Sequence, residues 1–280
     1  MSHPYRSVLY LPGARARVLE KAKTLPADAL IFDLEDAVAP DDKLTARNLV
    51  AETVKAGGYG ARKILVRING LDTQWGADDL DAAIAAEPDG ILVPKVCSGA
   101  DLTAISDKLT GKTRLWAMME TPAGILNAAE IAASTPILEG FVIGTNDLVK
   151  DLFAQHTADR VAVLTSLSIC LLAARANGLI CVDGVFNAFK DEAGLQIECQ
   201  QGRDMGFDGK TLIHPAQLDI ANTVFAPSAD DLALAERHIE AFAAVDGVAV
   251  VDGKIVENLH VETAQRLLAK SALIKKLREQ

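Results

Sequence analysis

Apolar residues recur along this chain in short runs, and each run ends in a polar or charged residue. There are eight such strand-like runs, beginning near residues 7, 29, 63, 90, 114, 139, 179 and 209. The intervals between them are long enough for one helix each. Several intervals carry helical cues, such as Arg17–Lys23, Asp78–Ala86 and Thr165–Ala176.

Strands that alternate with helices pair in parallel. The same alternation also fits a doubly wound open sheet, but a count of eight favours a TIM (β/α)8 barrel, whose usual size is roughly 250 residues. We predict this barrel over residues 1–225. Because TIM-barrel active sites lie at the carboxyl ends of the strands, the polar residues that end the runs are the candidates for function.

The pattern changes after Pro215, and we predict a C-terminal extension over residues 226–280. Two short strands are only marginally stable alone, so the extension must pack on the barrel or on a neighbouring subunit. Such a flap could cap an active site with a polar residue. The predicted elements are a helix over 228–245, a hairpin of Val248–Val251 and Ile255–Val256 about an Asp252-Gly253-Lys254 turn, and a helix over His260–Arg278.

Two carboxylates, Glu120 and Asp147, stand just after strand-like runs. Mg²⁺ and Mn²⁺ prefer hard oxygen ligands, and Mg²⁺ commonly takes one or two protein carboxylates with water and substrate oxygens. We therefore predict a Mg²⁺ site at this pair, with Mn²⁺ as a second possibility and helix capping as the alternative role. His214 lies at a strand end without an HxxxH motif or a Cys/His cluster, so zinc is not expected and His214 is predicted to be a hydrogen-bonded strand-end residue.

Arg67 lies in an alternating strand, Ile64-Leu-Val-Arg-Ile-Asn69, and should point into the barrel mouth, opposite to Val66 and Ile68. There it could hold a substrate carboxylate or an enolate oxygen. The alternative is a structural ion pair with Glu35 or Asp36. These two carboxylates are predicted to hold metal-bound waters or Arg67, with helix capping as their alternative role.

Two further places offer positive charge. Lys95 could form a Schiff base, although the carboxylates nearby favour anion binding or a salt bridge. Pro12, Gly13 and Arg17 belong to a glycine turn at a helix start that could bind phosphate. Solvated arginines on the helix are the alternative.

The formal net charge is −10 and the chain has no basic run, which argues against nucleic acid and anionic membranes as partners. The N-terminus lacks the apolar core of a signal peptide, and no apolar run approaches the roughly 20 residues of a membrane helix. We expect a cytoplasmic protein. Its four cysteines, Cys97, Cys170, Cys181 and Cys199, form no CxxC pair and are expected to be reduced thiols with packing roles.

Taken in order, eight segments closely resemble the CoA-ester lyases of the citrate lyase β-chain family, within the HpcH/HpaI aldolase superfamily, which includes malyl-CoA and citramalyl-CoA lyases. The resemblance covers nearly the whole chain. The matching segments are Leu9-Tyr-Leu-Pro-Gly13, Phe32-Asp-Leu-Glu-Asp-Ala-Val38, Arg67-Ile-Asn-Gly-Leu71, Val93-Pro-Lys-Val96, Met119-Glu-Thr-Pro-Ala-Gly124, Gly144-Thr-Asn-Asp-Leu148, Asp183-Gly-Val185 and Gly209-Lys-Thr-Leu-Ile-His-Pro215.

The resemblance implies a TIM barrel that assembles as a homotrimer or a dimer of trimers. Magnesium would be held by Glu120 and Asp147, and substrate would contact Arg67, Gly144 and Thr145. Coenzyme A would lie over the barrel mouth near the first strand's loop, with four cofactor-binding residues, Pro12, Gly13, Arg17 and Lys95.

Members of this family often cover the site with the neighbour's C-terminal segment, and some place a catalytic aspartate after its hairpin. The matching position here is Glu257. Its longer side chain could serve the same acid–base role, or could alter or remove it.

The resemblance implies reversible, Mg²⁺-dependent Claisen-type cleavage of a 3-hydroxyacyl-CoA into an acyl-CoA and a small 2-oxo acid. Three alternatives stay open. They are a metal-dependent aldolase acting on free 2-oxo acids, a malyl-CoA-type thioesterase, and a subunit that works only with an acyl-carrier partner, as the citrate lyase β chain does.

Overall fold

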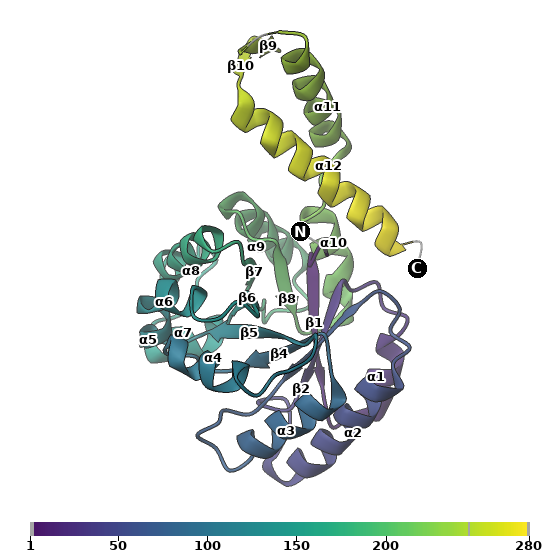
Figure 1. The fold of residues 1–280 in the computed structure, drawn as a ribbon, viewed down its shortest axis with the longest axis vertical. Helices are drawn as coiled ribbons and strands as arrows, with labels where there is room; N and C mark the ends of the chain where they lie inside the picture. Colours follow the sequence, from purple (N-terminus) through teal and green to yellow (C-terminus); the bar gives the residue numbers. More distant parts are fainter. Residues whose placement is uncertain (1–2, 246, 279–280) are drawn as a thin grey trace.

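The computed structural model describes residues 3–245 and 247–278, and its strands close into a barrel (Figure 1). Eight parallel strands follow one another in sequence order, and β1 also pairs with β8. This closure confirms the predicted TIM barrel and excludes the open sheet. The barrel strands are β1 (Ser7–Pro12), β2 (Ala29–Asp33), β3 (Lys63–Arg67), β4 (Gly90–Val93), β5 (Arg114–Met119), β6 (Leu138–Ile143), β7 (Ile180–Asp183) and β8 (Gly209–Leu212).

Helices lie in the intervals between the strands and surround the barrel (Figure 1). The three helical intervals singled out from the sequence are α1, α3 and α8, with ends within two residues of those predicted. Two short 3-10 helices, Pro40–Asp42 and Pro215–Gln217, precede α2 and α10. The helices are α1 (Ala16–Ala22), α2 (Lys43–Ala56), α3 (Gly76–Ala86), α4 (Gly99–Ser106), α5 (Pro122–Leu126), α6 (Ala128–Ala132), α7 (Thr145–Asp151), α8 (Leu164–Ala176), α9 (Glu192–Met205) and α10 (Leu218–Val224).

Alternation along the strands divides the core into two layers. One layer fills the barrel and includes Ile31, Leu65 and Trp116, while the other, with Phe32 and Val66, packs against the helices. Toward the carboxyl ends of the strands, the positions that face the barrel interior carry charged side chains. At the carboxyl ends of β2, β3 and β5 these inward residues are Asp33, Arg67 and Glu120.

A buried group of four charges ties β7 and β8 to the helical layer. Asp183 accepts hydrogen bonds from Arg160 (3.0 and 2.5 Å) and from Lys210 Nζ (3.0 Å). Lys210 also donates to Glu198 Oε1 on α9 at 2.6 Å. Two positive and two negative side chains balance, which is the condition under which buried charges are tolerated.

The extension has the predicted helix–hairpin–helix order. Ser228 caps its first helix by accepting the backbone N–H of Asp231 at 3.0 Å. Asp252 and Gly253 both have positive φ (50° and 75°), as a tight two-residue hairpin turn requires. The elements are α11 (Ala229–Ala243), β9 (Ala249–Val251), β10 (Lys254–Val256) and α12 (Asn258–Arg278).

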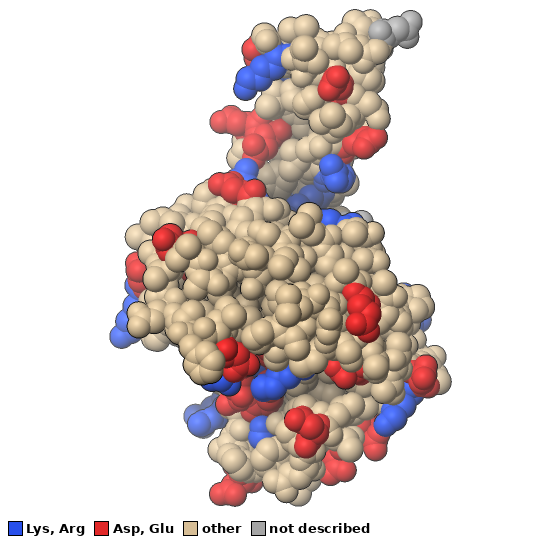
Figure 2. Space-filling model, turned by 90° about the vertical axis from the view of Figure 1, so that its left-hand side faces the viewer, with Lys and Arg blue, Asp and Glu red and all other residues tan. Residues whose placement is uncertain are grey.

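The extension stands on the amino-terminal end of its own barrel. Lys270 of α12 donates to the carbonyl of Asp208, the residue just before β8, at 3.2 Å. The hairpin is the part of the molecule farthest from the barrel (Figure 1), and the side view shows a narrow connection between the two parts (Figure 2). Glu257 follows β10 directly and therefore lies far from the carboxyl ends of this chain's strands. The division at residues 225 and 226 into two domains stays a prediction.

The cysteines within the described residues are free, and Cys170, Cys181 and Cys199 are buried. Burial raises the pKa of the Cys170 and Cys199 thiols to about 12, so these thiols stay protonated and suit packing. Among the helices that the structure describes, none combines the length and the apolar character needed to cross a membrane.

Candidate active site

A cavity of about 300 Å³ opens at the carboxyl ends of the strands. Six residues predicted from the sequence line it. They are Asp36, Arg67, Glu120, Gly144, Thr145 and Asp147. Other lining residues were not predicted as site residues. These are Tyr10, Asp33, Ala37, Met118, Ile143, Asn146, Val185 and Ile213.

Glu120 follows β5 and is 1% exposed. Its Oε1 accepts the backbone N–H of Lys95 at 2.8 Å, while its buried Oε2 has no hydrogen-bond partner among the described residues. Burial, followed by the negative charge of Glu35, raises the pKa of Glu120 to about 7. Thr121, rather than Glu120, caps α5 by accepting the N–H of Gly124 at 3.0 Å. The orphaned oxygen therefore points to a ligand.

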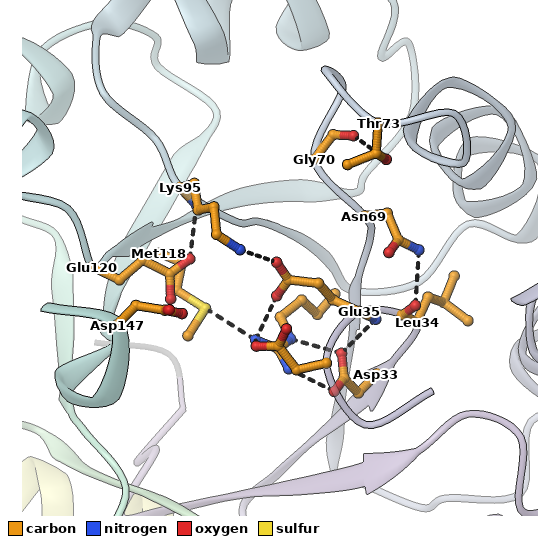
Figure 3. A network of polar contacts seen from close by, with 12 residues as sticks. Asp33, Leu34, Glu35, Asn69, Gly70, Thr73, Lys95, Met118, Glu120 and Asp147 are labelled. Carbon is orange, nitrogen blue, oxygen red and sulfur yellow. Dashed lines mark hydrogen bonds and ion pairs between the residues drawn. The ribbon is translucent and has the colours of Figure 1, made fainter. Parts of the chain in front are cut away.

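Gly144 is required beside this carboxylate because a Cβ at position 144 would overlap Glu120. Asp147 comes from the first turn of α7, one turn beyond Gly144, and its side chain is 26% exposed. Lys150 Nζ lies 3.2 Å from Asp147 Oδ1. Glu120 and Asp147 lie side by side at the cavity, next to Met118 (Figure 3).

The donor set at Glu120 and Asp147 fits Mg²⁺. Both residues offer hard carboxylate oxygens, and one of these oxygens is buried without a partner. Within residues 3–245 and 247–278, no group of three or more His, Cys, Asp or Glu side chains has the arrangement of a complete metal site. Two carboxylates suit a magnesium ion that completes its shell with water and substrate oxygens.

Arg67 is held in the plane of the Asp33 carboxylate. Its Nε and Nη2 donate to the two Asp33 oxygens at 2.7 and 2.6 Å, and its Nη1 lies 2.7 Å from Glu35 Oε2. The guanidinium also lies over the Tyr10 ring, 5.0 Å from its centroid. Burial alone would lower the pKa of Arg67, but Asp33 and Glu35 raise it well above its ordinary value, so the charge is permanent.

The predicted ion pair of Arg67 with Glu35 or Asp36 is thus present with both, at 2.7 Å to Glu35 Oε2 and 3.5 Å to Asp36 Oδ2. Asp33, which the sequence reasoning passed over, is the stronger partner. Its oxygens also accept the backbone N–H groups of Glu35 and Ala37 at 2.9 and 3.0 Å. One carboxylate therefore fixes both the guanidinium and the loop after β2.

Lys95 reaches across the mouth and donates to Glu35 Oε1 at 2.6 Å (Figure 3). Burial alone would lower the pKa of Lys95, but this hydrogen bond and the charges of Glu35 and Glu120 raise it above its ordinary value. The amine is therefore protonated and lacks the free electron pair that a Schiff base needs. Burial raises the pKa of Glu35, although Arg67 and Lys95 act in the opposite direction.

Lys43 is a second residue that the sequence reasoning missed. This lysine of α2 is 6% exposed, and its Nζ donates to the carbonyls of Leu34 and Glu35 and to Asn69 Oδ1 at 2.7, 2.8 and 2.7 Å. It joins the loop after β2 to the loop after β3. A lysine near the start of a helix gives no local sign that tertiary structure will bury it.

The remaining predicted residues lie at the edge of the mouth or away from it. Gly13 donates to the Asp33 carbonyl at 2.9 Å, and a Cβ there would lie only 2.6 Å from that oxygen, so β1 and β2 can approach only with glycine. Pro12 is half-buried, and Arg17 is exposed on α1. Phosphate or coenzyme A binding by these residues stays a prediction, as does the role of Glu257, which is exposed and remote from this chain's cavity.

His214 is a hydrogen-bonded strand-end residue, as predicted. Its Nδ1 accepts the backbone N–H of Ala216 at 3.2 Å, and its ring packs on Phe189 with centroids 4.7 Å apart.

The raised pKa of Glu120 generates a stability prediction for the metal-free protein. A pKa raised from 4.5 to about 7 means that stability is lost as pH rises through this window. Replacing Glu120→Gln removes this titration. The unfolding free energy of the variant minus that of wild type should therefore increase by about 2 kcal/mol, as an upper bound, from pH 5.5 to pH 8. Denaturant unfolding with EDTA at both pH values measures it. An equal difference at the two pH values would contradict the assignment, and Glu130→Gln serves as an exposed control.

Comparisons with known proteins agree with this geometry. Residues 6–215 match the HpcH/HpaI aldolase/citrate lyase family. A (3S)-malyl-CoA thioesterase of Cereibacter sphaeroides (strain ATCC 17025 / ATH 2.4.3) is 59% identical over 98% of this chain and 96% of that protein. Citrate lyase subunit beta of Escherichia coli (strain K12) is 34% identical over 96% and 93%.

Among solved structures, CitE of Mycobacterium tuberculosis in complex with magnesium, acetoacetate and coenzyme A is similar, with a TM-score of 0.81 and 31% identity over 95% of this chain and 97% of that chain. The chain therefore belongs to the HpcH/HpaI aldolase/citrate lyase family.

Proposed function

We propose that this protein is a Mg²⁺-dependent enzyme that hydrolyses coenzyme A thioesters of a small hydroxy dicarboxylic acid, of the (3S)-malyl-CoA class. The observation that carries the proposal is a cavity lined both by a fixed arginine, Arg67, and by a carboxylate with a buried, unpartnered oxygen, Glu120. The thioesterase that is 59% identical along nearly the whole chain favours hydrolysis over the other reactions of the family.

Glu120 and Asp147 are the residues that would hold Mg²⁺, and Mn²⁺ fits the same oxygens. When bound, the ion supplies Lewis-acid polarisation and a template for the hydroxyl and carboxylate oxygens of the acyl group. Gly144 and Thr145 form the cavity wall beside Glu120, where the acyl group would lie. The magnesium and coenzyme A bound to the similar CitE support this assignment.

Arg67 would stabilise the negative charge that develops on the thioester carbonyl oxygen. Its Nε and Nη2 donate to Asp33, while its Nη1 lies 2.7 Å from Glu35 Oε2 and donates to Met118 Sδ at 3.7 Å. A substrate oxygen would therefore take the second N–H of Nη2 or replace the weak contact with Met118. Because Asp33 fixes the guanidinium before substrate arrives, little reorganisation is needed during reaction. One such preorganised donor contributes roughly 3 to 4 kcal/mol to lowering the barrier.

Coenzyme A would cross the mouth above the turn from β1 to α1, with Pro12 at the end of β1, Gly13 in the turn and Arg17 on α1. The protonated Lys95, which follows β4, would lie across the mouth beside Glu35. Arg17 is free to meet a phosphate because it is exposed. Lys95 would contribute positive charge rather than a nucleophile.

Glu257 of a neighbouring subunit would act as the acid–base group, within a homotrimer or a dimer of trimers. In hydrolysis it would accept a proton from the water that attacks the thioester carbonyl. The carbon–sulfur bond then breaks, and the thiol of coenzyme A leaves with a proton. The products would be free malate and coenzyme A.

Carbon–carbon cleavage is the second candidate, favoured by the 34% identical citrate lyase subunit beta. The substrate hydroxyl would give its proton to the Glu257 carboxylate, directly or through water, the adjacent carbon–carbon bond would break, and its electron pair would form the thioester enolate beside Arg67. Glu257 would then protonate the enolate carbon to give the acyl-CoA, leaving a 2-oxo acid.

The first test incubates the purified protein and Mg²⁺ with malyl-CoA, methylmalyl-CoA, citramalyl-CoA and citryl-CoA, followed by mass spectrometry. We expect free coenzyme A and malate from malyl-CoA, abolished by EDTA. Glyoxylate, pyruvate or oxaloacetate together with an acyl-CoA would instead establish the lyase. If no thioester reacts, the proposal fails, and free 2-oxo acids and acyl-carrier substrates become the next assays.

Arg67→Lys tests the electrostatic role. Lysine keeps the positive charge but cannot pair with both Asp33 oxygens, so kcat should fall by about 10² to 10³ with a smaller change in KM. Steady-state kinetics measure both constants, and Arg62→Lys, away from the cavity, is the matched control. An unchanged kcat would remove Arg67 from the chemistry.

Glu257→Gln tests whether the site is shared between subunits. Alone, this variant and Arg67→Lys should each be nearly inactive. Co-assembled in equal amounts, they should regain about a quarter of the wild-type sites, because some cavities then combine an intact Arg67 with a neighbour's intact Glu257. Kinetics of the purified mixed oligomers measure the recovery, and no recovery would refute a role for Glu257 across the interface.

A further inference from the structure

A second cavity, of about 280 Å³, lies next to the catalytic cavity. The segment 155–163 bounds it on one side, and the loop after β7 and the start of α9 bound it on the other. Thr145 and Val185 line both cavities. These two side chains therefore form the wall between them.

The wall has a defined position. Thr145 is buried at the start of α7, and the loop after β7 presses against it, because a Cβ on Gly184 would lie 2.7 Å from both Thr145 Oγ1 and Cγ2. Val185 follows Gly184 directly and is half-buried. The close contact at Gly184 thus sets how far the Val185 side chain stands from Thr145.

The second cavity suits an alkyl group. Val149, Val163, Phe186 and Ile197 supply apolar lining. Arg160, Asp191 and Glu198 also line the cavity. Arg160 and Glu198 are already paired within the buried network with Asp183 and Lys210, and Asp191 accepts the backbone N–H of Gly194 at 2.9 Å. No charge of that network is left to attract an anion.

We propose that Val185, together with Thr145, determines the acyl specificity of the enzyme by separating the catalytic cavity from this apolar pocket. With Val185 in place, the enzyme accepts unbranched acyl groups in preference to branched ones. Without the Val185 methyl groups, the pocket becomes a subsite for a short alkyl branch on the carbon next to the thioester. The inference rests on the proposed function, since it assumes an acyl group lying between Arg67 and Glu120.

The test compares wild type, Val185→Ala and Ile213→Ala. Ile213 lines the catalytic cavity but not the second one, so it is the matched control. Calorimetry with Mg²⁺ measures the Kd of malate and of 3-ethylmalate, and kinetics measure kcat/KM for their coenzyme A thioesters. The preference for the ethyl-branched ligand should rise by about tenfold or more in Val185→Ala and stay unchanged in Ile213→Ala.

Val185→Ile provides the opposite change, because an added methylene thickens the wall. It should lower the relative affinity for 3-ethylmalate further, and it decides the matter if Val185→Ala does not fold. The inference is overturned if the folded Val185 variants keep the wild-type preference, or if wild type binds malate and 3-ethylmalate equally. In either case the proposed function stands as long as wild type binds malate and turns over malyl-CoA. If malate does not bind and malyl-CoA does not react in wild type, the proposed function fails and the inference fails with it.

Discussion

The ion pair between Asp33 and Arg67 determines the arrangement of the barrel mouth. Both side chains are almost fully buried, and a buried guanidinium without its carboxylate would cost several kcal/mol. From this pair alternating charges cross the mouth through Glu35 to the Lys95 ammonium, and the backbone N–H of Lys95 then donates to Glu120. Arg67 pairs with Asp33, Glu35 pairs with Arg67 and with Lys95, and Glu120 Oε1 accepts the backbone N–H of Lys95. Two buried oxygens of the network make no hydrogen bond among the described residues. Glu35 Oε2 still has the charge of Arg67 2.7 Å away, whereas Glu120 Oε2, at the end of this series, has no such ion pair.

Sequence reasoning could predict the barrel and much of the mouth because both depend on local alternation. The alternation of Val66 and Ile68 with Arg67 predicts an inward arginine, and the structure puts it there. The same rule applies to β2, where Ala29, Ile31 and Asp33 share the inward face. The sequence does not single out Asp33, because β2 resembles one apolar run that ends at Leu34 and is followed by Glu35.

Lys43 and the Gly144 contact could not be found this way. Lys43 is buried only because two loops from different strands meet above α2, and Gly144 is required only because Glu120 arrives from the neighbouring strand. Such facts depend on residues far apart in the sequence. A single chain without its fold holds no local pattern that distinguishes this lysine from a solvated one.

Hydrolysis and carbon–carbon cleavage place negative charge on the same thioester oxygen, so Arg67 and its supporting carboxylates serve either reaction. The two reactions differ in what the acid–base group faces, a water molecule or the enolate carbon. In the proposed function, that difference would depend on the reach and angle of Glu257 rather than on the barrel mouth. The relatives of this chain include one named as a thioesterase and one named as a lyase subunit.

In the proposed function, the extension would make the acid–base group a property of the assembly. α12 stands on the amino-terminal end of its own barrel, so the hairpin and Glu257 point away from the chain's own cavity. The hairpin exposes Val250 (67%) and Ile255 (62%), and a two-stranded sheet with an exposed apolar face gains stability when another surface covers it. Contact with a second copy would bury this face and deliver Glu257 in the same step. Completion of the active site and stabilisation of the extension would then be one event.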